Sequence, residues 1–168
     1  MSAAADVAGI EAPSAADRRH LEEMLDRCSE STLFHRFHGG GRNVPARYVD
    51  RLLEDSDRRR VLVARVGPDV VGVAEAHCDG SGTAELAVLV EDSWQHRGVG
   101  SRLVAALAAE GRRLGVDALR ATVLGEDRWV VRLLGRLGPL SGRPATGIFE
   151  VEVPLNRDPG GRGAVTRP

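Results

Sequence analysis

The stretch that decides the fold runs from Thr83 to Gly115 and reads TAELAVLVEDSWQHRGVGSRLVAALAAEGRRLG. Residues 84–90 form a short apolar run rich in Val and Leu, which is typical of a buried strand. A polar turn follows, and from Val99 onward apolar side chains recur every three to four positions, as in an amphipathic helix. Gly115 suits the end of such a helix. The stretch therefore predicts a strand, a glycine-containing loop and a helix.

The loop between that strand and that helix favours an anion site. The first turn of a helix has backbone N–H groups without an internal partner, and the helix dipole makes that end partly positive. Gly98 and Gly100 lack side chains, so a phosphate group can come close to these amides. Arg97 adds a guanidinium and Gln95 an amide donor. Neither the P-loop pattern nor the third glycine of a dinucleotide fingerprint is present. The alternative is an ordinary turn with a glycine hinge.

The composition predicts a single globular domain of 168 residues with a formal net charge of -1, which provides no global field for nucleic acid or an anionic membrane. All 23 Lys+Arg residues are arginine. Cys28 and Cys78 stand far apart, so we expect neither a disulfide framework nor a zinc site, and the cysteine usage fits a reducing cytoplasm. No apolar run approaches the length of a membrane span.

Ahead of the central stretch, the pattern predicts a first edge-like strand and two helices. The first helix starts near Ser14 or Asp17 and ends near Cys28, and the second runs from Pro45 through Leu53. Two further apolar runs, joined by a Gly-Pro-Asp turn, predict a hairpin. The expected strands cover residues 7–12, 61–66 and 70–77.

After Gly115, residues 118–124 read as a strand parallel to residues 84–90, because a helix crosses between them. Asp127 is expected to cap a helix over residues 128–137, in which Trp129 is expected to face the core. Two closing strands are predicted, around residues 140–143 and 148–153. We therefore expect an α/β (α+β) domain over residues 7–153, a disordered N-terminus (1–6) and a flexible C-terminal tail (154–168).

Residues 29–44, SESTLFHRFHGGGRNV, are expected to form a loop. Phe34 and Phe37 alternate with His35 and Arg36, and three glycines follow. One interpretation makes this loop a mobile, partly aromatic wall of a binding site, and the other uses both Phe rings to anchor it to the core. His35 has no Cys or carboxylate at a suitable spacing, so no metal site is expected.

The motif Gln95-x-x-Gly98-x-Gly100, between an apolar strand and an amphipathic helix, resembles the acyl-CoA pyrophosphate loop of the GCN5-related N-acetyltransferase (GNAT) superfamily. The resemblance spans about Val7 to Val153 and implies acetyl-CoA as the acyl donor. It also implies a mixed sheet of about six to seven strands flanked by about four helices, with a parallel strand pair splayed around the acyl-CoA. The expected cofactor contacts are Val88, Leu89, Val90, Gln95, His96, Arg97, Gly98, Val99, Gly100, Ser101 and Asp127.

The resemblance also implies an acceptor site and a general base. A lysine-type amine has a pKa of about 10.4 and must lose a proton before it attacks. Glu85 is the only charge in the run 84–90, and its place ahead of the glycine loop is similar to that of the general-base glutamate in protein-acetylating GNATs. The alternative to a catalytic role is that Glu85 lies at the exposed start of its strand and faces water. Glu75 is the reserve base, and His77 a weaker one.

The pattern departs from the family at the last helix. Many members carry Asn at its head and, seven residues later, a Tyr that protonates the leaving thiolate. Here Asp127 and Leu134 occupy those places, so no Tyr acid is present. Either water protonates the thiolate or no acid is needed, since a thiol has a pKa of about 8.5.

These features predict a cytoplasmic, acetyl-CoA-dependent N-acetyltransferase, monomeric or homodimeric. The SESTLFHRF segment is similar to that of bacterial GNATs that acetylate protein lysines, notably on acyl-CoA synthetases, so a protein lysine is the favoured acceptor. A small amine such as an aminoglycoside or polyamine is the alternative, and a non-catalytic acyl-CoA-binding regulatory domain is a further one. The sequence contains neither a basic helix nor an aromatic stacking platform, so nucleic-acid binding is not expected.

Overall fold

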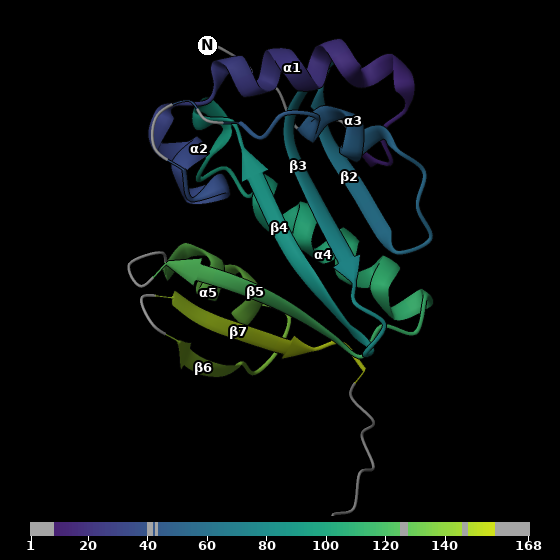
Figure 1. Cartoon of the computed structure of the whole chain (residues 1–168), viewed down its shortest axis with the longest axis vertical. Helices are drawn as coiled ribbons and strands as arrows, with labels where there is room; N and C mark the ends of the chain where they lie inside the picture. The colour runs from purple at the N-terminus through teal and green to yellow at the C-terminus, as the bar shows by residue number, and fades with distance from the viewer. Residues whose placement is uncertain (1–8, 40–41, 43, 125–127, 146–147, 157–168) are drawn as a thin grey trace, which may run out of the picture.

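The computed structural model describes residues 9–39, 42, 44–124, 128–145 and 148–156. Within them, one mixed sheet has the strand order β1-β2-β3-β4-β5-β7-β6 (Figure 1). Its strands are β1 (Gly9–Glu11), β2 (Arg59–Val66), β3 (Asp69–Cys78), β4 (Thr83–Val90), β5 (Ala118–Leu124), β6 (Ser141–Ala145) and β7 (Ile148–Pro154). The helices are α1 (Arg18–Arg27), α2 (Glu30–Phe37), α3 (Tyr48–Leu53), α4 (Val99–Arg113) and α5 (Arg128–Gly135), with short 3-10 turns η1 (Ala15–Asp17) and η2 (Asp92–Trp94).

The parallel pair β4 and β5 divides the sheet. Strands β1 to β4 are antiparallel neighbours, as are β5, β7 and β6. The parallel ladder is short and ends where Glu85 pairs with Arg120. Beyond that point β4 and β5 diverge, and Figure 1 shows the opening between their C-terminal ends. The predicted fold class, with a splayed parallel pair, is confirmed.

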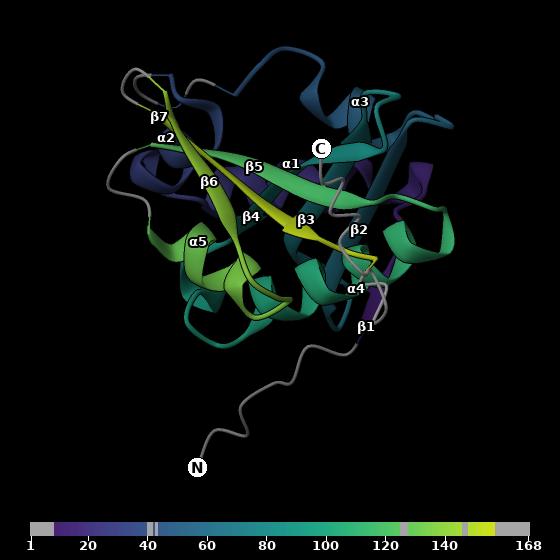
Figure 2. The same cartoon turned by 90° about the horizontal axis from the view of Figure 1, so that it is seen from below.

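Helices cover both faces of the sheet (Figure 2). On one face, α1, α2 and α3 pack their buried side chains against β2, β3 and β4. On the other face, α4 and α5 pack against a larger apolar cluster that continues onto β5 and β7. Consecutive strand residues serve opposite faces, as the pleat requires: Val73 joins the first cluster and Ala74 the second.

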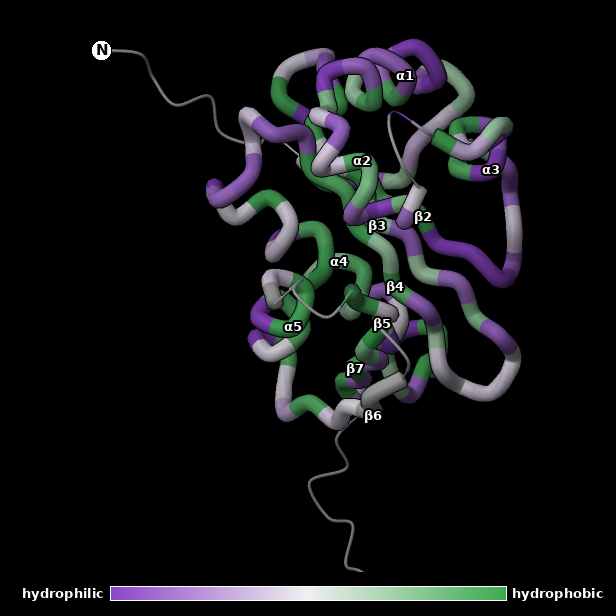
Figure 3. Tube along the Cα trace, turned by 60° about the vertical axis from the view of Figure 1, so that its left-hand side comes forward, coloured by the Kyte–Doolittle hydropathy of each residue, from purple (hydrophilic) through white to green (hydrophobic). Residues whose placement is uncertain are grey.

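Helix α4 is the main contact on its face of the sheet. Its apolar positions Val99, Leu103 and Leu107 are at most 1% exposed, and the helix runs as an apolar segment through the middle of the molecule in Figure 3. A Cβ added to Gly72 on β3 would lie 3.1 Å from the Leu103 side chain, so this glycine allows the helix to approach the sheet. The predicted strand–loop–helix unit is confirmed.

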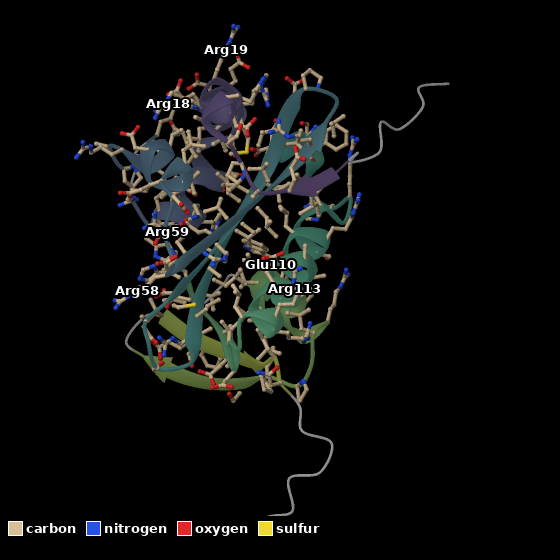
Figure 4. All side chains as sticks on the ribbon, turned by 90° about the vertical axis from the view of Figure 1, so that its right-hand side faces the viewer. Arg18, Arg19, Arg58, Arg59, Glu110 and Arg113 are labelled. Atoms are coloured by element: carbon tan, nitrogen blue, oxygen red, sulfur yellow. The ribbon has the colours of Figure 1, made fainter. Side chains whose placement is uncertain are left out.

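Many charged side chains lie on the outside of the fold (Figure 4). Figure 4 shows Glu110 and Arg113, which form an ion pair on the outward side of α4, and Arg58 and Arg59 at one end of β2. Among the described helices, none has the length and apolar character that a membrane span requires. Several predicted bounds shift: the predicted second helix, α3, begins at Tyr48 rather than Pro45, α5 ends at Gly135 rather than at residue 137, and β1 is described only from Gly9. The predicted disordered N-terminus and most of the predicted tail lie outside the described residues.

Candidate active site

A cavity of about 880 Å³ lies where β4 ends and α4 begins. Helix α2 borders it on one side and α5 on the other, and Figure 3 shows these two helices on either side of the start of α4. Residues from the predicted cofactor loop contribute part of its lining. The lining consists of Ser29, Ser31, Thr32, His35, Arg36, Val88, Leu89, Val90, Asp92, Gln95, His96, Gly98, Val99, Gly100, Ser101, Trp129, Arg132, Leu133 and Arg136.

The start of α4 presents backbone donors to this cavity. Gly98 is the N-terminal cap and has a φ of 81°, a left-handed conformation that suits glycine, and a Cβ there would meet nothing within 4 Å. Within the described residues, no acceptor takes a hydrogen bond from the backbone N–H of Val99, Gly100 or Ser101. On the side that faces β5, the edge of β4 also has no ladder partner beyond Glu85 among the described strands. This end of the cavity can therefore bind an anionic, amide-bearing ligand.

Two of the predicted cofactor residues have other contacts. The Gln95 amide Nε2 donates to Thr32 Oγ1 (2.9 Å) and to the Val90 carbonyl (3.0 Å), so the side chain fastens the loop to α2 and β4. The Arg97 guanidinium lies over the Trp94 ring, 5.0 Å from its centroid, and is not part of the lining. Asp127 lies outside the described residues. The other predicted cofactor residues, Val88–Val90, His96 and Gly98–Ser101, all line the cavity.

Asp92, which the sequence did not single out, joins the loop to α2. Its carboxylate accepts hydrogen bonds from the Ser29 backbone N–H (2.9 Å), from Ser29 Oγ (2.6 Å) and from Thr32 Oγ1 (3.1 Å). Burial works to raise the pKa of Asp92, but the Ser29 and Thr32 hydrogen bonds outweigh it and hold that pKa below its ordinary value. The carboxylate is therefore ionised at neutral pH.

Helix α5 adds a second group of residues that sequence reasoning missed. Trp129, Arg132, Leu133 and Arg136 all line the cavity, and Arg136 donates to Ser101 Oγ at 2.8 Å. The expectation that Trp129 faces the core is wrong: it is 37% exposed, and Val130 and Leu134 fill the core instead. The i, i+3, i+4, i+7 spacing of the four residues was the signal that places them on one helix face. This face brings two arginines beside the N-terminus of α4.

The acceptor segment is a helix, not the predicted loop. Ser29 caps α2 because its side chain accepts from the Thr32 backbone N–H, and the helix continues to Phe37. The two Phe rings differ in environment. Phe34 is 41% exposed and meets the His35 ring edge-on, whereas Phe37 packs edge-on against Tyr48 with ring centroids 4.9 Å apart. Of the two rings, therefore, only Phe37 anchors the segment, together with the buried Leu33, and His35 and Arg36 line the cavity.

Arg36 links the cavity to the reserve base Glu75. The two form a close ion pair in which both side chains are 17% exposed. The Arg36 guanidinium also lies near the Phe37 and Tyr48 rings, with centroid distances of 4.9 and 5.3 Å. Burial, the largest cause, raises the pKa of Tyr48, so its hydroxyl stays neutral. Glu75 is thus held by Arg36 beneath the cavity.

Glu85 lies at the point where β4 and β5 separate. It is exposed, pairs in register with His77 across β3 and with Arg120 across β5, and makes no ion pair within the described residues. The pleat places it on the same face as Glu75, because Glu75 pairs with Ala87, two residues further along β4. Glu85 is not part of the cavity lining. The two predicted carboxylates therefore share one face but differ in exposure and partners.

One group of possible metal ligands occurs among the described residues, and it lies away from the cavity. His20 and Glu23 of α1 approach Asp69 at the start of β3. Glu23 is already paired with Arg19 at 2.7 Å. None of the three lines the cavity, so the group has no part in the site described above.

The same architecture occurs in known acetyltransferases. The GNAT domain of S. lividans PAT superposes with a TM-score of 0.79 at 23% identity, covering 86% of this chain and 89% of that chain. The yncA acetyltransferase of Salmonella typhimurium, solved with its cofactor acetyl-CoA, gives a TM-score of 0.70 at 22% identity, covering 92% of this chain and 98% of that one. Both matches support the fold.

A curated relative gives closer sequence similarity over a shorter region. The acetyltransferase Pat of Mycolicibacterium smegmatis is 37% identical over 73 residues, which are 42% of this chain. The match spans only 22% of that longer relative. The model of the acetyltransferase (GNAT) family matches residues 21–138, which include α2 to α5, the glycine loop and the cavity lining. The chain therefore belongs to the acetyltransferase (GNAT) family.

Proposed function

We propose that the chain transfers the acetyl group of acetyl-CoA to a primary amine, with a protein lysine as the favoured acceptor, by direct attack on the thioester. The cavity at the end of β4, bordered by α2, α4 and α5, is the observation that carries this proposal. It combines backbone donors at Val99 to Ser101 with a free strand edge and with α2 opposite. These features fit a long ligand that has a diphosphate at one end and amide groups along its length.

Different residues are proposed to bind different parts of the acyl donor. The first turn of α4 is suited to the diphosphate, and Arg132 and Arg136 supply positive charge next to it. The unpaired edge of β4 at Val88 to Val90 offers a backbone N–H to the thioester oxygen, a type of contact that contributes about 3–4 kcal/mol in acyl transfers. Gln95 lines the cavity, and its side chain also holds this edge and the loop in place.

Deprotonation of the acceptor is assigned to Glu85, with Glu75 in reserve. Glu85 has no ion-pair partner among the described residues and stands at the vertex between β4 and β5, where a lysine side chain can approach from outside. Glu75 is occupied by Arg36. Because Glu85 does not line the cavity, a water molecule is expected to relay the proton from the amine to its carboxylate.

A protein lysine is favoured as acceptor for two reasons. The similarity to the Pat relative supports it, and the exposed position of Glu85 suits an acceptor that remains attached to a larger surface. An acyl-CoA synthetase is the protein class we propose to test first. Small amines such as polyamines form the second arm of the same assay.

The test is a CoA-release assay with acetyl-CoA and panels of acyl-CoA synthetases and small amines. We expect release with at least one protein substrate. Glu85→Gln should retain acetyl-CoA binding and lose about a hundredfold in turnover at neutral pH, with part regained at higher pH as the amine deprotonates by itself. Glu30→Gln, an exposed glutamate on α2 outside the lining, is the matched control. Unchanged turnover in Glu85→Gln would remove Glu85 as the base, and release with small amines alone would remove the protein acceptor.

A further inference from the structure

Helix α2 is fastened to the cofactor loop by side chains that themselves line the cavity. Asp92, just after β4, accepts from the Ser29 backbone N–H and hydroxyl and from the Thr32 hydroxyl. The two partners are 60 or more positions away in sequence. A helix N-terminus is normally capped from within its own chain segment, and Ser29 already provides that cap. The additional carboxylate therefore joins two elements rather than completing one.

Thr32 is the junction of this network. Its hydroxyl donates to Asp92 at 3.1 Å and accepts from Gln95 Nε2 at 2.9 Å. A hydroxyl has one proton to donate, so these two contacts fix its orientation. Gln95 then reaches the Val90 carbonyl at the end of β4. The end of β4, the loop and the first turn of α2 are thus connected through one side chain.

The C-terminal half of α2 contacts the acceptor side of the site through Arg36. Arg36 lies four residues after Thr32, hence on the same helix face, and both residues line the cavity. Arg36 pairs with Glu75 beneath it. A displacement of the loop by a bound ligand would therefore be transmitted to Arg36 by a helix only two turns long.

We propose that Thr32 and Asp92 are positioning residues that hold the cofactor loop and α2 as one unit, so that occupancy of the donor site orders the acceptor side of the cavity. The proposal rests on the proposed function, because it takes CoA as the ligand of the loop. It assigns no chemical step to either residue.

Hydrogen–deuterium exchange with and without CoA tests the coupling directly, because it requires no knowledge of the acceptor. In the wild-type chain, CoA should slow amide exchange both in the loop around Gly98 and in α2. In Thr32→Val, which keeps the size and removes the hydroxyl, the loop should still be protected while protection of α2 falls about tenfold. Thr32→Ser should restore it, and Glu30→Gln should behave as wild type.

The outcomes separate the coupling from the donor site. Full protection of α2 in Thr32→Val, or protection confined to the loop in the wild type, overturns the coupling while the donor site stands. No protection by CoA anywhere in the wild type overturns the donor site and the coupling with it. If Thr32→Val does not fold, Asp92→Asn serves as the second variant, with the same expected loss in α2.

Steady-state kinetics provide an independent measurement once an acceptor is known. Thr32→Val should raise the KM of the acceptor about tenfold with a smaller change in kcat, since the chemical groups are retained. A helix that is merely destabilised would lower the fraction of active protein, which reduces kcat and leaves KM unchanged. A change in kcat alone would contradict the positioning role.

Discussion

The donor and acceptor ends of the candidate site are built in different ways. The donor end is formed mainly by residues of the segment 88–101, which offer backbone N–H groups fixed by a strand and a helix, with Arg132 and Arg136 beside them. The acceptor end brings together α2, β3 and β4, and its groups are side chains: Arg36, Glu75 and Glu85. The donor end therefore depends on local backbone geometry, whereas the acceptor end depends on tertiary contacts between distant residues.

This difference predicts which substitutions each end tolerates. Backbone donors remain when a side chain changes, provided that the φ and ψ angles are kept. A partly buried ion pair loses its compensation as soon as one partner is removed. The donor end should therefore be sensitive at its glycines, and the acceptor end at its charges.

The largest expected effect is at the acceptor end. Arg36→Leu should lower the free energy of unfolding by about 3 kcal/mol, because it leaves the Glu75 carboxylate partly buried without its partner. Denaturant unfolding measures this loss. The double substitution Arg36→Leu with Glu75→Leu should recover part of it. Arg113→Leu, which removes an exposed pair with Glu110, should cost no more than about 1 kcal/mol. If Arg36→Leu and Arg113→Leu lose the same free energy of unfolding, burial of the Arg36–Glu75 pair is irrelevant.

The second effect is at the donor end. Gly98→Val should weaken CoA binding about a hundredfold, because a β-branched residue at a φ of 81° distorts the start of α4. Titration calorimetry measures it. Gly67→Val, at a φ of 57° in the β2–β3 turn, is the control and should reduce stability but not affinity. Unchanged CoA affinity in Gly98→Val would mean that the α4 amides do not hold the ligand.

The third effect concerns stability at Asp17, which lies away from both the donor and the acceptor end of the site. Burial works to raise the pKa of Asp17, but hydrogen bonds from Ser14 and the ion pair with Arg65 outweigh it and lower that pKa. A lowered folded-state pKa stabilises the fold above the ordinary value of about 3.9, and this stability is lost as the pH falls through the folded pKa. Asp17→Asn should cost about 2 kcal/mol at pH 7, and the difference from wild type should shrink below about pH 4.

Unfolding measured from pH 7 to pH 2 checks this dependence. CoA affinity at pH 7 should be unchanged in Asp17→Asn, since Asp17 lies on the α1 side and does not line the cavity. A pH-independent difference between the two proteins would indicate that lost packing, not lost charge, explains the destabilisation.

The smallest effect concerns charge at the donor end. Arg132→Glu should weaken CoA binding about tenfold at low salt and less at high salt, because it reverses an exposed charge on the cavity wall. Binding titrations at two ionic strengths measure both quantities. Arg113→Glu makes the same charge change at the far end of α4 and should have little effect. Equal losses would indicate that only net charge matters.

Several predicted features were within reach of sequence reasoning because they are local. The apolar run 84–90, the glycines at 98 and 100 and the helix period after Val99 gave the unit that the structure contains. The antiparallel strands before it and the parallel strand after it followed from connection lengths. The segment 29–37 misled because its Ser, His and interleaved aromatic residues resemble a loop, whereas an added tertiary tether from Asp92 supports it as a helix.

By itself, the sequence determined the fold class, the place of the glycine loop and the family, because strand and helix periods and chain turns act over short distances. Only the tertiary structure decided that Gln95 ties the loop to α2, that Trp129 faces the cavity and that Glu75 is paired while Glu85 is exposed. Those outcomes depend on which side chains from distant segments meet. A contact between residues 36 and 75 leaves no mark in the local pattern of either one.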